Sequence, residues 1–511
     1  MEKITTCLLM LLVIQNVFSQ NIGIGTPTPH ASARLDITST NSGFLPPRMT
    51  TLQKDAISNP APGLMVFNTD TQELEIYTSG GWFIIKSSLP PAEFLLGGSV
   101  NEVATSICKT TDGGFITAGF STSSGSGNVT GINNGSSDFW IVKQNASGTM
   151  LWNRLIGGNS ADRANSIQQT SDGGYIVTGF SFSSLSGDIV VANHGGSDIW
   201  VVKLDATGNI NWNKLLGGTG NETVYSIQQT SDGGYIVSGS STSSVNGNVT
   251  GTNHGSMDSW IIKLDATGNI TWSRLLGGVN DEEANSIQQT TDGGYIVSGY
   301  SSSSADGDVT ATNHGGNDIW VMKLDASGNI NWNKLLGGTA NDAGNSIVQT
   351  SDGGYIIAGF TLSTSNGDVA ANHGLSDLWI VKLNAAGTIS WAKLYGGTNL
   401  EAANSIQQTS DGNYIVAGYT NSNNNGDITV PSHGMTDFWI MKLDAVGNII
   451  WNKLLGGNGD DQAYQIQQLP NGKYIVAGHS ASSANGDVTA TNHGSLDFLI
   501  FRLDALGNII R

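Results

Sequence analysis

Cysteine is nearly absent from this chain, which has only two among 511 residues. Cys7 lies inside an apolar N-terminal run, so Cys108 alone remains beyond it. A single cysteine excludes an intramolecular disulfide in the main part of the chain. The fold must therefore be stabilised by its packing and its architecture.

Charged side chains and long apolar runs are also scarce. Asp, Glu, Lys and Arg make up 12% of the residues, and the formal net charge is −19. This charge repels a nucleic-acid backbone and an anionic membrane surface, so we predict no nucleic-acid partner. Beyond the N-terminal run, no stretch approaches the roughly 18 apolar residues of a membrane span, so no membrane insertion is predicted. Cations and neutral polymers remain as partners.

Residues 1–19 have the features of a secretory signal. The run from Ile4 to Phe18 is almost wholly apolar and follows Lys3. It is too short to span a bilayer, and the small Ser19 marks an expected cleavage site. Cys7 lies too early for the cleavage site of a lipoprotein. We therefore predict a secreted or cell-surface protein.

A 60-residue repeat accounts for nearly all of the chain after residue 91. Gly is abundant, with 68 residues, and a composition rich in Gly, Ser, Thr and Asn favours strands joined by turns over long helices. The turn Asp-Gly-Gly-aromatic, or a close variant of it, recurs at intervals of 59 or 60 residues. Its seven copies begin at Asp112, Asp172, Asp232, Asp292, Asp352, Asp411 and Asn471.

One repeat, residues 221–280, reads as four short strands with turn signals between them. The expected strands are residues 225–230, 235–240, 258–265 and 269–276. Asp232-Gly-Gly and Ala266-Thr-Gly-Asn are typical of tight hairpins, whereas a longer Ser/Gly/Asn loop joins the second and third strands. Four antiparallel strands in each of seven repeats predict an all-β, seven-bladed β-propeller over residues 91–511.

The two ends of this region complement each other. The chain stops at Leu503-Asp-Ala-Leu-Gly-Asn-Ile-Ile-Arg511, where the other repeats continue into a fourth strand ending in Leu-Gly-Gly. That missing half appears before the first repeat, as Glu93-Phe-Leu-Leu-Gly-Gly98. Joining the two halves would complete the seventh blade and close the ring, which removes an exposed sheet edge.

The repeat resembles the secreted bacterial β-propeller repeat known as the SBBP type. Leu215-Leu-Gly-Gly218, Gly234-Tyr-Ile-Val-Ser-Gly239 and Asp258-Ser-Trp-Ile-Ile-Lys-Leu-Asp265 carry the resemblance in this order. It covers about four fifths of the chain and implies the propeller fold. It implies no activity, because such families are defined by the repeat alone.

Residues 20–88 lie outside the repeat, differ from it in composition and pattern, and contain most of the prolines. Asn21-Ile-Gly-Ile-Gly-Thr, Gly43-Phe-Leu-Pro-Pro-Arg-Met49 and Pro62-Gly-Leu-Met-Val-Phe-Asn-Thr-Asp70 are similar to a leader module of secreted Bacteroidetes proteins and to phage tail-fibre segments. The resemblance implies a small β-rich adhesive or oligomerising module, with a homotrimer through residues 21–88. Residues 87–91 are the expected linker.

Two residue types recur at fixed positions of the third strand. A Trp there and another in the fourth strand could stack on sugars, but identical positions in successive blades favour packing of blade against blade. The Asp two residues before the third-strand Trp occurs in all seven blades, and a capping role towards loop amides is favoured over catalysis. These aspartates are Asp138, Asp198, Asp258, Asp318, Asp377, Asp437 and Asp497.

The long loop before the third strand carries the candidate ligand-binding residues. It contains Gly-Asp-Val/Ile followed by Asn-His-Gly in most blades, and the first blade has Asn128 and Asn134 at the two positions. Carboxylate and imidazole ligands could bind a cation, Ca²⁺ or a transition metal, whereas a loop pinned by hydrogen bonds needs no ion. The identity of a metal stays open, and no cofactor is otherwise predicted. The candidate residues are Asp188, His194, Asp308, His314, Asp368, His373, Asp427, His433, Asp487 and His493, with Asn248 and His254 at the equivalent positions of the third blade.

These loops and the connections between blades are expected on one face of the ring. The connections are acidic, which predicts a negative, loop-rich face where a ligand would bind. The residues concerned are Asp162, Glu222, Asp281, Glu282, Glu283, Asp342, Glu401, Asp460 and Asp461.

The sequence favours a non-catalytic binding or adhesion protein that recognises an extracellular glycan or a surface protein. Two alternatives stay open: a polysaccharide-degrading propeller enzyme, either a lyase or a glycoside hydrolase, and a structural matrix component. No catalytic residue is assigned, because catalysis needs a unique asymmetric cluster and the blades are nearly identical. Only scattered unique residues could build such a cluster, namely Arg163, Tyr395, Tyr464 and His479.

Overall fold

The computed structural model describes residues 22–24, 35–37, 44–71, 73–84 and 93–510. The chain divides into two compact units, Met1–Ser88 and Leu89–Arg511. The expected signal, residues 1–19, lies outside the described residues, as do the expected linker at 87–91 and Arg511. Among the described residues, no helix combines the length and the apolar character that crossing a membrane requires.

The first unit contains two small sheets. Strands β1 (Ile22–Ile24) and β2 (Leu35–Ile37) pair in parallel, and the second sheet has the order β3-β4-β5-β6. A capping box formed by Thr50 and Gln53 begins its short helix, and Lys54 in that helix forms a buried ion pair of 2.7 Å with Glu75. The elements of the second sheet and the helix are β3 (Arg48–Met49), α2 (Thr51–Asp55), β4 (Met65–Asn68), β5 (Glu73–Thr78) and β6 (Gly81–Ile84).

The second unit is built from four-stranded antiparallel sheets, as the repeat predicts. In the repeat of residues 221–280, the strands are β16 (Glu222–Gln229), β17 (Tyr235–Ser241), β18 (Asp258–Leu264) and β19 (Ile270–Leu276), each within three residues of the expected bounds. The remaining sheets follow in chain order. They are β8 (Glu102–Lys109), β9 (Phe115–Ser121), β10 (Asp138–Gln144) and β11 (Met150–Ile156); β12 (Asp162–Gln169), β13 (Tyr175–Ser181), β14 (Asp198–Leu204) and β15 (Ile210–Leu216); β20 (Glu282–Gln289), β21 (Tyr295–Ser301), β22 (Asp318–Leu324) and β23 (Ile330–Leu336); β24 (Asp342–Gln349), β25 (Tyr355–Thr361), β26 (Asp377–Leu383) and β27 (Ile389–Tyr395); β28 (Glu401–Gln408), β29 (Tyr414–Thr420), β30 (Asp437–Leu443) and β31 (Ile449–Leu455); and β32 (Asp461–Gln468), β33 (Tyr474–Ser480), β34 (Asp497–Leu503) and β7 (Glu93–Leu96).

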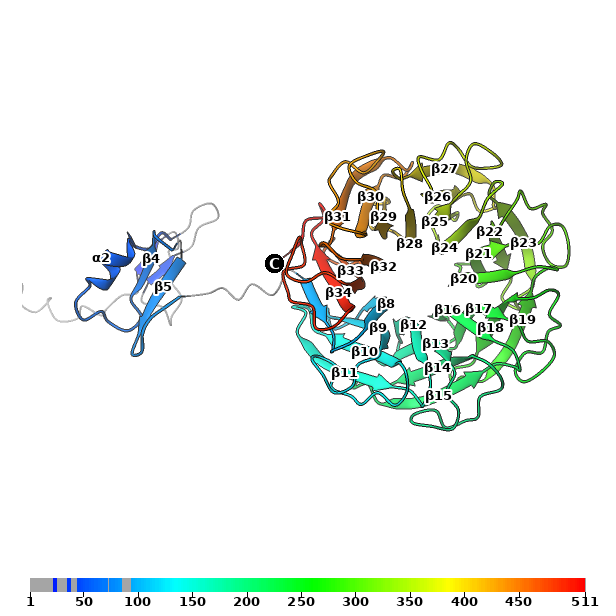
Figure 1. Cartoon of the computed structure of the whole chain (residues 1–511), viewed down its shortest axis with the longest axis horizontal. Helices are drawn as coiled ribbons and strands as arrows, with labels where there is room; N and C mark the ends of the chain where they lie inside the picture. The colour runs from blue at the N-terminus through cyan, green and yellow to red at the C-terminus, as the bar shows by residue number, and fades with distance from the viewer. Residues whose placement is uncertain (1–21, 25–34, 38–43, 72, 85–92, 511) are drawn as a thin grey trace, which may run out of the picture. The chain divides into compact units, whose positions relative to one another are not determined.

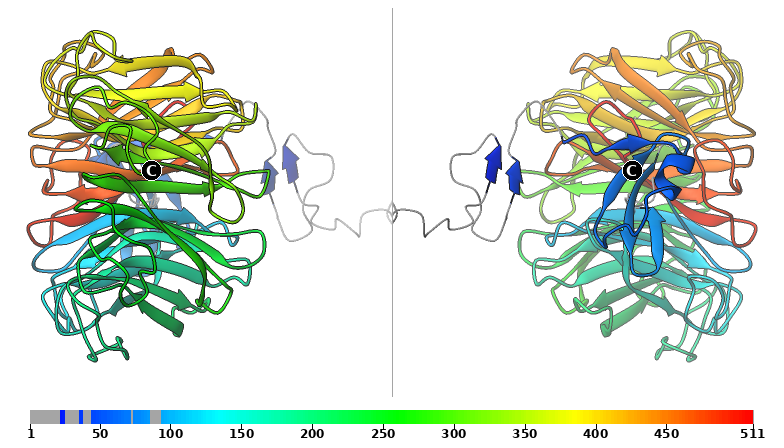
Figure 2. Two further views of the ribbon diagram at one scale, coloured as in Figure 1. Left: turned by 90° about the vertical axis from the view of Figure 1, so that its right-hand side faces the viewer. Right: turned by 90° about the vertical axis from the view of Figure 1, so that its left-hand side faces the viewer.

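The sheets lie around a common axis, with the first strand of each repeat innermost (Figure 1). Figure 2 shows the same unit edge-on. The last sheet combines the two ends of this unit, because β7 pairs antiparallel with β34 in the register Phe498↔Leu96 to Phe501↔Glu93. We refer to the sheets as first to seventh, starting from the sheet that contains β8.

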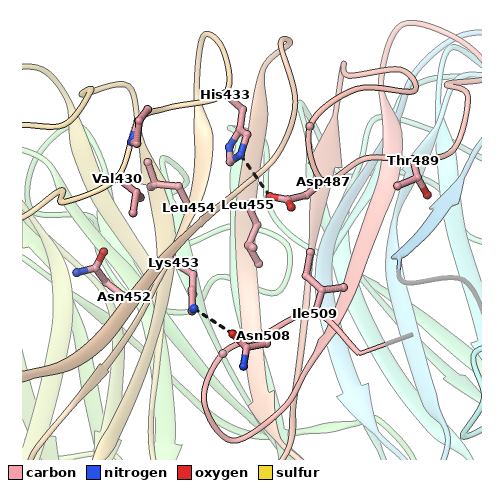
Figure 3. A pocket seen from close by; sticks show the side chains of 13 residues that line it. Val430, His433, Asn452, Lys453, Leu454, Leu455, Asp487, Thr489, Asn508 and Ile509 are labelled. Carbon is pink, nitrogen blue, oxygen red and sulfur yellow. Dashed lines mark hydrogen bonds and ion pairs between the residues drawn. The ribbon is translucent and has the colours of Figure 1, made fainter.

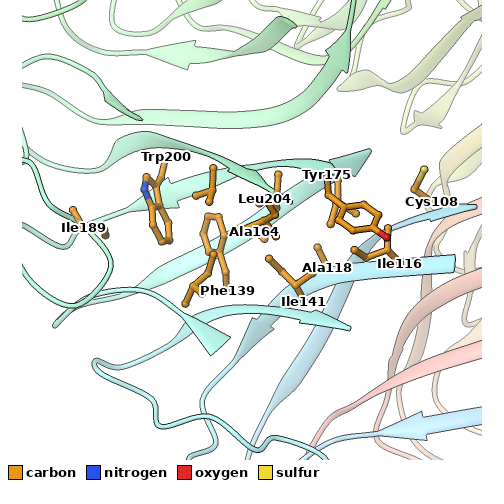
Figure 4. Close-up of a cluster of buried hydrophobic side chains, with 14 of the residues drawn as sticks. Cys108, Ile116, Ala118, Phe139, Ile141, Ala164, Tyr175, Ile189, Trp200 and Leu204 are labelled. Atoms are coloured by element: carbon orange, nitrogen blue, oxygen red, sulfur yellow. The ribbon is translucent and has the colours of Figure 1, made fainter. Parts of the chain in front are cut away.

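The core lies between neighbouring sheets. Phe139 of the first sheet packs against Trp200 of the second, with ring centroids 4.7 Å apart, in a cluster of buried side chains (Figure 4). The third-strand Trp residues are at most 1% exposed, so they form this core and cannot stack on a sugar. At the seam between the seventh and first sheets, Phe498 packs against Trp140 at 4.5 Å, and Leu499 occupies the third-strand Trp position.

The fourth-strand Trp residues also pack across the seams. Trp212 meets Tyr235 of the next sheet at 5.9 Å, nearly edge to face. A Cβ atom at Gly268 would lie 2.6 Å from the Trp212 ring, and this glycine has φ +82°. The hairpin turns of the second to seventh sheets therefore cover the Trp of the preceding sheet, and that of the first sheet covers Phe94 of β7, as the structural interpretation of these residues expects.

Candidate functional site

The third-strand aspartates hold the long loops in place. Asp198 is completely buried, and its Oδ2 accepts hydrogen bonds from the His194 backbone N–H at 3.0 Å and from His194 Nδ1 at 2.7 Å. The same two contacts recur at His254, His314, His373 and His493. This is the capping role that the repeat predicts, and it occupies Nδ1 of these histidines.

The loop aspartates bind a different partner. Asp188 Oδ2 accepts a hydrogen bond of 3.1 Å from the Gly157 backbone N–H, in the connection that enters the same sheet. Asp308, Asp368 and Asp427 contact Gly277, Gly337 and Gly396 in the same way. Asn128 and Asn248 make the equivalent contact through Oδ1, so the position requires an acceptor oxygen but no charge.

The structure therefore does not pair the loop residues as the sequence suggests. No hydrogen bond or ion pair joins Asp188 to His194, both of which the structure describes. The pairing that occurs crosses a seam, where His433 Nε2 lies 3.6 Å from Asp487 Oδ2 of the next sheet. In the described part of the chain, no group of three or more His, Cys, Asp and Glu side chains is arranged to hold a metal ion.

The His433–Asp487 pair lines a groove at the seam between the sixth and seventh sheets (Figure 3). The groove has a volume of about 550 Å³. Lys453 also lines the groove and donates a hydrogen bond of 3.1 Å to Asn508 Oδ1 of the next hairpin turn. A similar groove of about 530 Å³ lies at the preceding seam and contains His373 and Asp427. The seam grooves thus bring together candidate residues from successive repeats.

The expectation of exposed acidic connections is wrong for most of the residues concerned. Glu222, the first residue of β16, is fully buried, and its carboxylate accepts hydrogen bonds from Gly218 N–H at 2.8 Å and from the Ser241 hydroxyl at 2.7 Å. From its sequence position such a residue is expected beside the loop, but hydrogen bonds from backbone amides and hydroxyl groups stabilise its carboxylate in the interior. The residues buried in this way are Asp162, Glu222, Glu282, Asp342, Glu401 and Asp461; Asp281 is exposed, and Asp460 and Glu283 are half-buried.

Each buried carboxylate lies beside a second one. A Cβ atom at Gly217 would lie 2.2 Å from Asp198 Oδ1 and 2.4 Å from Glu222 Oε2, which explains why the Gly-Gly connection carries no side chain. Asp198 Oδ1 is buried without a hydrogen-bond partner, and the same holds for its counterparts in the other six sheets. Burial close to other carboxylates disfavours the ionised form.

The electrostatic consequence is clearest at Asp138. Its burial, followed by the nearby carboxylates of Asp162 and Asp188, raises the pKa of Asp138 to about 7. Burial raises the pKa of Asp437 to about 6, with Asp461 and Asp487 adding to the rise. These groups hold protons at mildly acidic pH.

We predict that the second unit, Leu89–Arg511, which we call the ring unit, becomes less stable as the pH rises from 5 to 8. The folded state binds the Asp138 proton more tightly than the unfolded chain, in which an Asp has a pKa of about 3.9. The stabilisation is therefore full below about pH 4 and is lost as the pH rises towards about 7. We expect the midpoint of thermal unfolding to fall by several degrees, and Asp138→Asn to reduce that fall.

Asp138 suits this test because Asn134, rather than a histidine, lies four residues before it. The control is Asp112→Asn. Partial burial opposes ionisation of Asp112, but hydrogen bonds from Lys143 and Thr110 lower its pKa to about 2, so it stays ionised over the range tested. The control should destabilise equally at pH 5 and pH 8. An unchanged pH profile in Asp138→Asn would contradict the prediction.

The four unique residues noted in the sequence do not form one cluster. The Arg163 guanidinium lies over the Phe120 ring at 4.4 Å, and the Tyr395 hydroxyl donates to the Gly447 carbonyl in the next hairpin turn. Tyr464 and His479 are neighbours, with ring centroids 5.7 Å apart. Tyr464 also lines a cavity on the axis of the ring, together with Tyr225, which sequence reasoning overlooked.

Comparison with known proteins finds a family match in the N-terminal part. Residues 23–103 match the family described as phage tail like trimerisation region. The match includes the strands of the first unit and extends through β7 to the start of β8. This agrees with the resemblance to tail-fibre segments.

One curated relative is more distant. The regulatory protein FlaEY of Caulobacter vibrioides is 25% identical over 326 residues, which cover 58% of this chain and 34% of that protein. The chain thus spans about a third of the length of this curated relative.

Three of the similar solved structures are described by low identities and TM-scores below 0.5. BamB from Moraxella catarrhalis has 12% identity and a TM-score of 0.33, covering 78% of this chain and 85% of that one. The Pan2 WD40 domain of Neurospora crassa has 10% identity and a TM-score of 0.41, covering 80% and 94%. YCF48 bound to D1 peptide has 8% identity and a TM-score of 0.40, covering 81% and 96%.

Proposed function

We propose that this chain is a secreted or cell-surface adhesion protein whose seam grooves bind a neutral extracellular glycan without catalysis. The observation that carries this proposal is the groove at the seam between the sixth and seventh sheets, which combines polar and apolar side chains. His433, Lys453 and Asn508 can hydrogen-bond to hydroxyl groups, while Val430 and Ile509 offer apolar contacts. Its volume of about 550 Å³ lies in the range of ligand sites, and a related groove occurs at the preceding seam.

The proposal includes a closed, seven-bladed propeller as the rigid support of these grooves. Support comes from the pairing of β7 with β34, which joins the start of the ring unit to its end. The SBBP-type repeat and the apolar run before Ser19 support secretion.

We also propose that residues 21–88 assemble the chain into a homotrimer. The match to a trimerisation region supports this assembly. Three rings on one stalk would raise the effective concentration of binding sites, so weak contacts to a repetitive polymer would add up to firm attachment. Light scattering of the full chain should give three times the mass of one chain, and the mass of one chain for residues 89–511.

A non-catalytic role fits the state of the carboxylates better than hydrolysis or elimination does. Asp188, Asp308, Asp368 and Asp427 accept hydrogen bonds from backbone amides, and the acids that begin the innermost strands are buried. They form no unique pair facing a groove. The enzyme alternative predicts that incubation with extracellular polysaccharides releases shorter products, and the matrix alternative predicts no glycan binding at all.

The test is an array of neutral extracellular glycans probed with the full chain. We expect retention of at least one glycan class, a tenfold or greater loss of affinity in His433→Ala, and no loss in the matched control His194→Ala. Chelation of Ca²⁺ should leave binding unchanged, because the loop carboxylates already bind amides. An empty array would overturn the proposal, and so would release of digestion products.

A further inference from the structure

A second site lies on the axis of the ring, apart from the seam grooves. The fourth residue of each innermost strand points into a cavity of about 390 Å³, which Glu283 also lines. Its volume lies in the range of sites for small molecules. The seven equivalent residues are Thr105, Asn165, Tyr225, Asn285, Asn345, Asn404 and Tyr464.

The orientation of the amides is fixed by their partners. Asn345 Nδ2 donates to the Ala403 carbonyl of the next innermost strand at 2.9 Å, and Asn404 Nδ2 donates to the Ala463 carbonyl at 2.8 Å. Asn165 and Asn285 bind the next strand in the same way. A carbonyl can only accept, so the amide nitrogen is the atom that faces the neighbouring strand, and Asn404 Oδ1 lies 3.5 Å from Asn345 Nδ2 of the preceding strand.

The lining is therefore rich in acceptors. The Thr105 hydroxyl donates its proton to the Ala164 carbonyl at 2.8 Å, which leaves its lone pairs free. Asn285 Oδ1 is buried without a hydrogen-bond partner. None of the eight lining residues carries a positive charge. A ligand that satisfies this ring must donate several hydrogen bonds.

Two tyrosines break the repeat. Tyr225 and Tyr464 stand where four other sheets have Asn, and they supply aromatic surface to a cavity that is otherwise polar. The Tyr225 hydroxyl donates to Glu283 Oε1 at 2.5 Å, which fixes both side chains. The lining of the cavity is therefore asymmetric about the axis, although the strands that form it are repeats of one another.

We infer that this axial cavity binds the ring of a neutral sugar, either free or at the end of a glycan. The hydroxyl groups would donate to Asn285, Asn345 and Asn404, and the apolar face of the sugar ring would pack against Tyr225 or Tyr464. An aliphatic amine also donates hydrogen bonds, but it carries no ring for the tyrosines to cover. The inference stands independently of the seam grooves.

The repeat itself supplies the test variants. Tyr225→Asn and Tyr464→Asn place at each position the residue that four other sheets already carry, so both chains should keep the fold. The probe is a panel of free neutral hexoses and pentoses in saturation-transfer NMR with the full chain. We expect at least one sugar to bind, with affinity at least tenfold weaker in each variant.

Val348→Gln is the matched control. Val348, like Cys108, stands where five other sheets have Gln, in a second cavity on the axis that shares no lining residue with the proposed site, so this change introduces a residue that the repeat already carries without touching that site. Its sugar binding should equal that of the unaltered chain. Absence of sugar binding overturns the inference, as does full binding in both Tyr variants. Binding of putrescine in place of the sugars also overturns it, because the site would then select a cation.

Discussion

A chain that begins at residue 99 should unfold several degrees below one that begins at residue 89. Both lack the first unit, but only the shorter one lacks β7 (Glu93–Leu96), the fourth strand of the seventh sheet. β7 buries Phe94 and Leu95, and burial of each such side chain contributes about 1.5–3 kcal/mol. Glu93 is buried too, and its Oε1 accepts hydrogen bonds from the backbone of Thr489 and Ala490.

Loss of β7 also leaves β34 as an open edge, which is a template for pairing between chains. Calorimetry would measure the melting temperatures, and light scattering during heating would report the aggregation expected of the shorter chain. Equal melting temperatures for the two chains would show that the β7–β34 pairing contributes nothing to stability.

The second large effect is expected at the third-strand tryptophans. Trp320 is fully buried, so Trp320→Ala should cost about 3–5 kcal/mol of unfolding free energy through lost contacts and a cavity. Trp320→Leu should cost less, because Leu499 already occupies the equivalent position in the seventh sheet. Trp332, half-buried against Tyr355 at 5.9 Å, is the matched control and should lose less on truncation to Ala.

Denaturant unfolding of the three variants measures these losses. The buried and half-buried tryptophans separate core packing from surface packing, because the same atoms are removed in Trp320→Ala and Trp332→Ala. A cost at Trp332 equal to that at Trp320 would mean that the exposed fraction of the ring makes no difference.

The repeat made the strands predictable, but it did not make the contacts between sheets predictable. Spacing alone located β16 to β19 within three residues, because turn residues and alternating apolar residues are local signals. The burial of Glu222 depends in part on Ser241 of the paired strand, which approaches it only after the sheet has formed. The acidic residue can be read from the sequence, whereas the hydrogen bonds that stabilise its burial cannot.

The candidate sites show the same division. Pairing Asp487 with His493 follows their closeness in sequence, whereas the structure places Asp487 beside His433 of the preceding repeat. That contact depends on the angle between two sheets, which no local pattern encodes. The axial cavity had a detectable signal, since Tyr225 and Tyr464 replace the Asn of other repeats, but only the ring brings these positions together.

The composition of the seventh sheet has a consequence for the order of folding. β7 is synthesised before every other strand of the ring, and β32, β33 and β34 are synthesised after all the rest. β7 therefore stays unpaired while some 400 residues between it and β34 are synthesised. Sheets one to six can fold as they appear, since each takes its strands from one stretch of chain. Pairing over so long a separation is slow, so closing the last sheet should be the final and rate-limiting step.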